Sequence, residues 1–177
     1  MLRTLHTFRA ACLLVLGLLA VSACGGRQSA PTLPSGKRLA VLVFMDRTVS
    51  PETPPDKVSQ LQEVADFMEP DLLALLRNAG YDAAVASGDA PPAAGQYKLN
   101  VQITDYNGGS KAARMFVGFG AGSARLESHF ELFGPNGASY TSGSPGASTS
   151  QASWQRTARK VNQEIVSAVS VRLRQGL

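Results

Sequence analysis

Polar and apolar residues alternate strictly in the stretch Tyr97-Lys-Leu-Asn-Val-Gln-Ile-Thr104. In an extended chain, Tyr97, Leu99, Val101 and Ile103 point to one side and the polar residues to the other. The stretch 125–132 repeats the pattern, with Leu126, Phe130 and Leu132 alternating with Arg125, Glu127, His129 and Glu131. Strands of this kind belong to a sheet with one dry and one solvated face, which is usually antiparallel.

Two other stretches, 58–79 and 154–169, repeat apolar residues at steps of three and four, which predicts amphipathic helices. Pro70 interrupts the first and predicts a kink or two helices that share one apolar face. Gly80 follows it as a C-terminal cap. The buried stripe of the second is expected to contain Trp154, Ala158, Val161, Ile165, Ala168 and Val169.

The remaining strands are predicted from shorter signals. The continuous apolar run Arg38 to Met45 indicates a strand buried on both faces. Residues 81–86 predict a short strand and residues 139–142 a weak edge strand. The fold class is therefore α/β, an α+β two-layer sandwich, with a mostly antiparallel sheet of about four to five strands and two main helices on one face.

The N-terminus has the features of a secretory signal. Arg3 and Arg9 precede an apolar run from Ala10 to Val21, and small residues lead to Cys24. The run is shorter than the roughly 20 residues of a membrane-spanning helix. A plain signal cut after Ala23, with Cys24 unmodified, is an alternative. The sequence Val21-Ser-Ala-Cys24 resembles the lipobox of bacterial lipoproteins, which implies a diacylglycerol on the thiol of Cys24.

The expected organisation follows from that lipobox. Residues 1–23 are the signal peptide, residues 24–36 the lipidated cysteine and a flexible tether rich in Gly, Pro and Ser, and residues 37–177 a single periplasmic domain. Acyl chains would attach the protein to a membrane. Gly25 stands where lipoproteins of the inner membrane often carry Asp, so the periplasmic face of the outer membrane is expected.

The composition gives reasons not to expect several classes of function. Removing residues 1–23 from the 177 leaves 154 with 15 basic and 13 acidic residues, which gives no reason to expect nucleic-acid binding. Cys12 is lost with the signal and Cys24 is lipidated, so no disulfide and no thiol chemistry are expected. His129 is the one histidine left, in an alternating stretch typical of a partly exposed strand, and no zinc site, metal or cofactor is expected.

The acidic residues of the domain leave one enzymatic function to consider. Asp46, Asp105 or Glu131 could serve as acid or base of a hydrolase acting on cell-wall or lipid substrates, but such catalysis needs two carboxylates in one cleft. The sequence does not place two of them together. The expectation is that the protein is not an enzyme.

The stretch 106–125 is too apolar for an ordinary exposed loop and too rich in glycine for an ordinary strand. Its glycines lack the spacing of a dinucleotide-binding loop. It is either a hairpin extension packed on its own sheet or a surface that contacts membrane or neighbouring subunits. The candidate interaction residues are Arg114, Phe116, Gly118, Phe119, Gly120 and Gly122.

The block from Tyr97 to Gly137, with its core Gly-Ser-x-Ala-Ala-Arg-x-x-Val-Gly-Phe-Gly-Ala-Gly-Ser-Ala, resembles the bacterial lipoprotein family of domain of unknown function 4410. The resemblance extends more loosely from Arg38 to the C-terminal helix. It implies location and fold, because that family has no established activity.

A more distant similarity is to the curli secretion channel lipoproteins. Residues of a membrane-spanning hairpin in that ring-shaped pore match Gly108, Gly109, Ala113, Arg114, Phe116, Gly118, Gly120 and Ala121. This chain is much shorter and has no counterpart of the second membrane hairpin, so the similarity implies a shared periplasmic module.

The expected function is that of a non-enzymatic outer-membrane lipoprotein with a structural or assembly role. The alternative is an oligomeric subunit or accessory of an outer-membrane export channel. The expected partners are the membrane, through the lipid anchor, and either further copies of the chain or another envelope protein.

Overall fold

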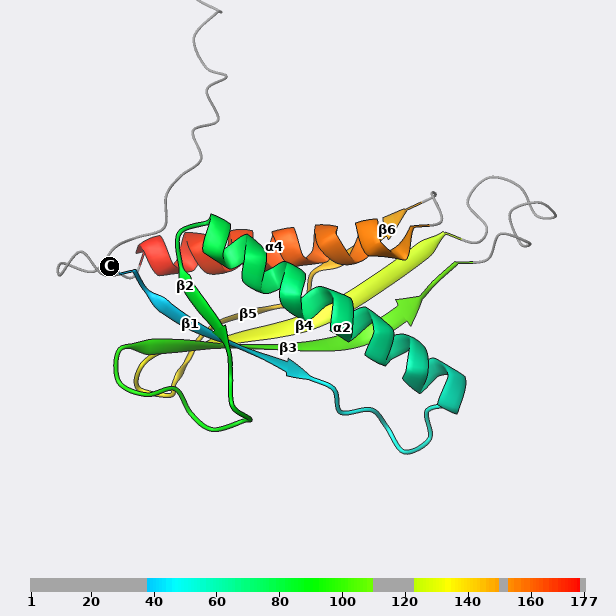
Figure 1. The fold of residues 1–177 in the computed structure, drawn as a ribbon, viewed down its shortest axis with the longest axis horizontal. Coiled ribbons are helices and arrows are strands. Elements are labelled where there is room, and N and C mark those ends of the chain that lie inside the picture. Colours follow the sequence, from blue (N-terminus) through cyan, green and yellow to red (C-terminus); the bar gives the residue numbers. More distant parts are fainter. Residues whose placement is uncertain (1–37, 110–122, 150–152, 176–177) are drawn as a thin grey trace, which may run out of the picture.

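The computed structural model describes residues 38–109, 123–149 and 153–175. They form two layers, a six-stranded sheet and a pair of helices that covers one of its faces (Figure 1). The helices are α2 (Pro55–Asn78) and α4 (Trp154–Gln175). The strands are β1 (Ala40–Asp46), β2 (Asp82–Val85), β3 (Gln96–Asn107), β4 (Ala124–Phe133), β5 (Ser139–Gly143) and β6 (Gly146–Thr149).

The sheet has the strand order β2-β1-β3-β4-β5, and β6 also pairs with β4. β1 is parallel to β2 and β3, whereas β4 is antiparallel to β3, β5 and β6. This confirms the predicted fold class, with two helices on one face of a mostly antiparallel sheet. The sheet has six strands because residues 146–149, in a Ser/Gly-rich stretch without a strand pattern, pair with the first half of β4.

β1 departs from its prediction. Val41, Val43 and Met45 are buried, but Leu42 and Phe44 between them are only half-buried. The helices cover one face of β1, and among the described residues no second layer of helices covers the other (Figure 1). The prediction of a strand buried on both faces is therefore wrong, because apolar residues also occupy the partly covered face of this strand.

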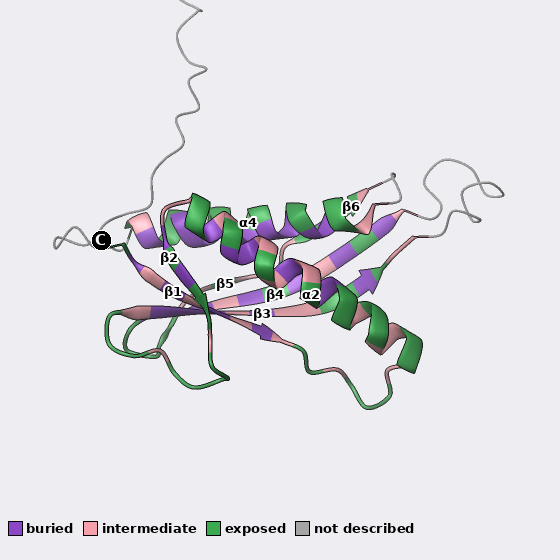
Figure 2. Cartoon of the chain, viewed as in Figure 1, coloured by how far each residue is buried: buried purple, intermediate pink, exposed green. Residues whose placement is uncertain are grey.

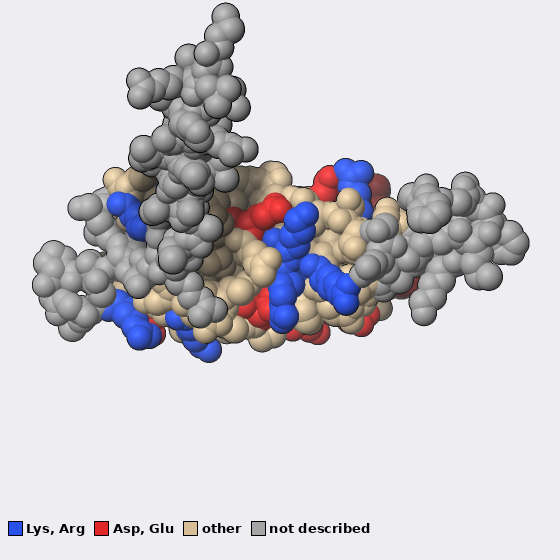
Figure 3. All heavy atoms as spheres, turned by 90° about the horizontal axis from the view of Figure 1, so that it is seen from above, with Lys and Arg blue, Asp and Glu red and all other residues tan. Residues whose placement is uncertain are grey.

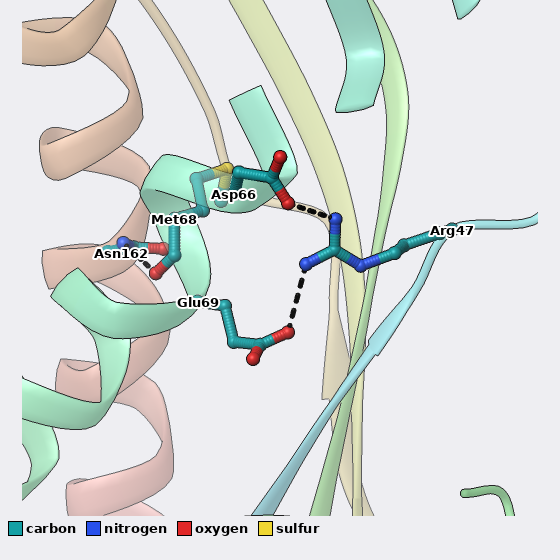
Figure 4. A network of polar contacts seen from close by, with 5 residues as sticks. All are labelled: Arg47, Asp66, Met68, Glu69 and Asn162. Carbon is teal, nitrogen blue, oxygen red and sulfur yellow. Dashed lines mark hydrogen bonds and ion pairs between the residues drawn. The ribbon is translucent and has the colours of Figure 1, made fainter. Parts of the chain in front are cut away.

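α2 is one helix although Pro70 lies inside it, so of the two predicted alternatives, a kink or two helices, the second is wrong. Proline has no N–H to donate to the preceding turn. The turn around Pro70 is held from the sheet side by Arg47, which forms ion pairs with Asp66 and, at 3.2 Å, with Glu69 (Figure 4). These contacts connect the end of β1 to the middle of the helix.

α4 holds the same turn from the other side. Asn162 is fully buried and its Nδ2 donates to the carbonyl of Met68 at 3.0 Å (Figure 4) and to Asp71 Oδ2 at 3.0 Å. Asp71 also pairs with Arg159 Nη2 at 2.8 Å. On the helical side of the molecule, Lys and Arg side chains lie next to Asp and Glu side chains (Figure 3). The two helices are thus joined by polar contacts as well as by packing.

The core lies between the helices and the sheet, where the buried residues concentrate (Figure 2). The predicted stripe of α4 is buried at Ala158, Val161, Ile165 and Val169 and half-buried at Trp154. Ala168 is exposed, contrary to prediction, whereas the polar residues Thr157 and Asn162 are buried. Gly80 has φ +98° and its N–H donates to the Arg77 carbonyl, which confirms it as the residue that ends α2.

Candidate functional site

The predicted interaction residues Arg114, Phe116, Gly118, Phe119, Gly120 and Gly122 lie outside the described residues, and so does Cys24. What the structure describes are the two ends of the segment 110–122. The chain runs from β3 through Gly108 and Gly109 into this segment and returns to β4 through Ser123. These two ends form the candidate site.

The chain leaves β3 through a bend that needs both of its glycines. Asn107 Oδ1 accepts a hydrogen bond from the N–H of Gly109 at 2.9 Å, and Gly109 has φ +74°, a conformation that favours glycine. A Cβ at Gly108 would lie 2.8 Å from the hydroxyl oxygen of Tyr106. Gly108 therefore provides space for a ring and Gly109 provides the backbone turn.

Tyr106 anchors this end of β3 in the core. A register shift between Ile103 and Asp105 places Tyr106 opposite Leu126, on the face covered by the helices, where Tyr106 is 5% exposed. Lys57 Nζ of α2 lies 5.5 Å from the centre of the ring. Burial raises the pKa of Tyr106, and the charge of Glu63 raises it further. The bulge thus turns an aromatic side chain inward just before the segment begins.

On the returning strand, polar side chains line a hollow of about 360 Å³, formed by Ser123, Arg125, Glu127, Gly146, Ala147 and Ser148. Arg125 pairs with Glu127, with Nε 3.2 Å from Oε1. The hydrogen bond to Glu127 raises the pKa of Arg125, and the charges of Glu127 and then Asp105 add to the effect. The hollow lies on the face of the sheet opposite the helices, directly beside the end of the segment.

The carboxylates considered for hydrolysis are not brought together. Asp46 lines a small cavity with Arg47 and Leu61, and its Oδ1 accepts from the N–H of Thr48 at 2.8 Å. Within the described part of the chain, neither Asp105 nor Glu131 lines the hollows at Asp46, Arg125 or Lys98. Asp46, Asp105 and Glu131 therefore form no acid and base pair at any of these three hollows.

His129 is exposed on β4, as the alternation predicts, and its Nδ1 lies 3.1 Å from Ser144 Oγ. Among the described residues, no three His, Cys, Asp or Glu side chains are grouped so that they could hold a metal ion. None of the described helices is long and apolar enough to cross a membrane.

Sequence reasoning missed three features. The Asn-Gly-Gly run after β3 is a recognisable turn signal, but the bulge that buries Tyr106 has no signal in the alternation. The burial of Lys98, on the face predicted to be solvated, depends on the loop between β2 and β3. The buried Asn162 interrupts an apolar stripe and carries no signal of its partner on α2.

Solved structures share this fold. A PelC dodecamer from Paraburkholderia phytofirmans matches with a TM-score of 0.50 and 18% identity, covering 80% of this chain and 94% of that chain. A variant of the same dodecamer matches with a TM-score of 0.47 and 20% identity, covering 80% of this chain and 93% of that chain. At this level of identity the first match shows a common fold. No curated protein matches the chain.

A family model matches far more of the chain than the glycine segment alone. It spans residues 31–172, so among the described elements it covers α2, the six strands and α4 up to its last turn. The chain belongs to the family described as Domain of unknown function (DUF4410).

Proposed function

We propose that this protein is a lipid-anchored component of the outer membrane that faces the periplasm and acts in assembly rather than catalysis. Its domain would comprise residues 37–177, attached through the tether 24–36 after removal of residues 1–23. The lipobox at Cys24 supports the anchor. Asp46, Asp105 and Glu131 share none of the three hollows at Asp46, Arg125 and Lys98, which supports a role without acid–base chemistry.

The observation that carries the proposal is the position of Gly109 and Ser123, which flank the segment 110–122, relative to the start of the domain. β1 is parallel to β3, and Ala40 lies beside Gln96 at one end of the sheet. Asn107 pairs with Arg125 at the other end. The 12 residues of β3 span about 40 Å. The segment therefore begins at the end of the domain that is far from the entry of the tether.

The tether is short compared with that length. Thirteen residues, 24–36, have a root-mean-square end-to-end distance of about 20 Å if they behave as a flexible chain. A domain that stands upright on this tether would hold the segment away from the membrane, because β3 is about twice as long as the tether. In that orientation Arg114, Phe116, Gly118, Phe119, Gly120 and Gly122 would face a partner rather than the membrane surface that holds Cys24.

A second candidate is a ring-forming subunit or accessory of an export channel in the outer membrane. It is favoured by one observation, the common fold with a chain that forms a dodecamer. In this candidate the partner is another copy of the chain. A closed ring requires two different complementary surfaces on each copy, and the segment 110–122 would form one of them.

The test is the mass of the lipidated protein, extracted from outer membranes in mild detergent and measured by light scattering with correction for detergent. A discrete assembly of many copies supports the ring. A monomer rules the ring out, and cross-linking through residues 112–124 then looks for another envelope protein. A monomer that cross-links to nothing contradicts the assembly role altogether.

Two variants separate the parts of the proposal. Gly120→Val should leave secretion and lipidation intact but abolish association, whereas Ala168→Val, at an exposed position of α4, should leave association unchanged. Unchanged association in Gly120→Val contradicts the role of the segment. Cys24→Ser should release the protein from the membrane fraction, and its retention there would contradict the lipid anchor.

A further inference from the structure

Lys98 is a buried lysine near the start of β3, on the sheet face that the helices leave open. Its side chain is 3% exposed. It lies in β3 between Leu42 of β1 and Phe133 of β4. Lysine is almost never fully buried unless its charge is paired. The charge here is paired by the loop that connects β2 to β3, residues 86–95, which we name the strap.

The strap supplies both oxygen partners of the ammonium group. Lys98 Nζ donates to Asp89 Oδ1 at 2.8 Å and to the carbonyl of Ala90 at 3.0 Å. It also lies 4.9 Å from the centre of the Phe44 ring, within the range of a cation–π contact. The side chain of Asp89 is 76% exposed. A solvent-facing carboxylate thus covers a buried cation.

The strap has the construction of a stiff segment between two hinges. Gly88 has φ +91° and Gly95 has φ +80°, and a Cβ at either position would meet nothing within 4 Å. Both glycines therefore serve the backbone conformation rather than close packing. Pro91 and Pro92 between them restrict their own φ angles. Rotation at the two glycines would lift the segment that carries Asp89 as a unit.

A cavity of about 220 Å³ lies between the strap and the sheet, lined by Asp89, Pro91, Pro92, Lys98, Asn100, Phe133 and Gly137. Asn100 Nδ2 reaches Asp89 Oδ1 only at 3.5 Å, and Asn100 Oδ1 is buried without a hydrogen-bond partner. A buried acceptor without a donor lowers stability. The closed strap therefore pairs Lys98 fully but leaves the amide beside it incompletely satisfied.

We propose that Lys98 is the centre of an anion-binding site, which the carboxylate of Asp89 occupies from within the chain. The ligand class is a small molecule with a carboxylate or phosphate group. Its oxyanion would replace Asp89 on Lys98 Nζ, and an adjoining apolar part or ring would contact Phe133 and the two prolines. Asn100 Nδ2 would donate to the oxyanion in place of Asp89, and movement of the strap would let water donate to Asn100 Oδ1. This site is independent of the function proposed above for the segment 110–122.

The test uses the lipidated protein in mild detergent and inorganic phosphate as the probe. Potassium phosphate is compared with potassium chloride at equal ionic strength, and Tm is measured. Asp89→Ala should gain about 2–4 °C in phosphate. The wild type should need roughly tenfold more phosphate for the same rise, because its tethered carboxylate competes at high effective concentration. Asp105→Ala, which removes an exposed carboxylate from the same face, should behave as the wild type.

The double variant Asp89→Ala, Lys98→Met should lose the phosphate effect. If it does not fold, the backbone amide signals of Asp89→Ala replace it, and shifts centred on residues 96–100 support the site. Potassium acetate in place of phosphate distinguishes a carboxylate ligand from a phosphate ligand. The proposal is overturned if neither anion raises the Tm of Asp89→Ala, if the double variant keeps the rise, or if the amide shifts lie elsewhere.

Discussion

The two faces of the sheet are stabilised by different interactions. On the face covered by the helices, Val41, Leu99 and Leu132 are fully buried in a continuous apolar core. On the open face, charged and polar side chains of β3 and β4 pair with loop residues, as Lys98 does with Asp89, or within one strand, as Arg125 does with Glu127. The stability of the covered face depends on having an apolar residue at each inward position. The stability of the open face depends on particular pairs of polar side chains.

The largest expected effect is on the covered face. Leu99→Ala removes a side chain with no exposure at the centre of β3 and should lower the free energy of unfolding by about 2–5 kcal/mol. Gln102→Ala, a half-buried position on the open face of the same strand, should change it by less than about 0.5 kcal/mol. Urea unfolding of both variants measures the difference. Similar losses in the two would mean that the faces are not distinct.

The next effect concerns a polar group within the covered layer. Asn162→Ala leaves the Met68 carbonyl and Asp71 without the amide that they share across the two helices. It should lower the free energy of unfolding by about 1–3 kcal/mol. Gln163→Ala, at the neighbouring exposed position of α4, is the matched control. Urea unfolding again provides the measurement. A loss no greater than that of the control would show that the turn around Pro70 needs no support from α4.

A smaller effect, which depends on pH, is expected on the open face. The hydrogen bond from Lys98 lowers the pKa of Asp89 below its usual value, and the positive charge of Lys98 adds to this. The ion pair therefore stabilises the fold at pH values above the ordinary pKa of aspartate, about 3.9. This stability is lost as the pH falls through the lowered value.

Asp89→Asn measures that contribution directly. The wild type should have the higher Tm at neutral pH, and the difference between the two proteins should vanish in acid. Asp82→Asn, an exposed aspartate of β2, is the control. A difference in Tm that is the same at neutral and acid pH would show that the charge of Asp89 does not hold the strap.

The contrast between the two faces of the sheet also explains how much of the fold can be predicted from the sequence. The alternation in β3 and the stripes at Val161, Ile165 and Val169 are local patterns with fixed periods, and they predict both the elements and the covered face. Lys98 and Asn162 show where such reasoning ends. Each is a polar residue whose burial depends on a partner at a distance, nine residues away for Asp89 and 94 for Met68.

The candidate site also has one part that the sequence predicts and one part that it does not. The turn at Asn107, Gly108 and Gly109 follows from residue types that form turns, and its neighbourhood was singled out in the sequence. The bulge that turns Tyr106 inward is visible only in the pairing of β3 with β4. One residue of extra length in a strand moves the following side chains to the other face, so the inward position of Tyr106 cannot be read from the period established at Tyr97.

The smallest expected effect on stability is that of the ion pairs of Arg47, the residue that follows β1. Arg47 pairs with Asp66 and Glu69 beside Pro70, but its side chain is 40% exposed and that of Asp66 is 68% exposed. Exposed pairs typically contribute about 0.2–1 kcal/mol and are screened by salt. Arg47→Ala should therefore lower the free energy of unfolding by less than Asn162→Ala does, and the loss measured by urea unfolding should shrink in about 1 M NaCl.

Lys160→Ala, at an exposed position of α4, controls for the loss of a surface charge. If Arg47→Ala costs as much as Asn162→Ala and is insensitive to salt, the turn around Pro70 is held mainly from the sheet side, and a charged contact then matters to α2 as much as the buried amide does.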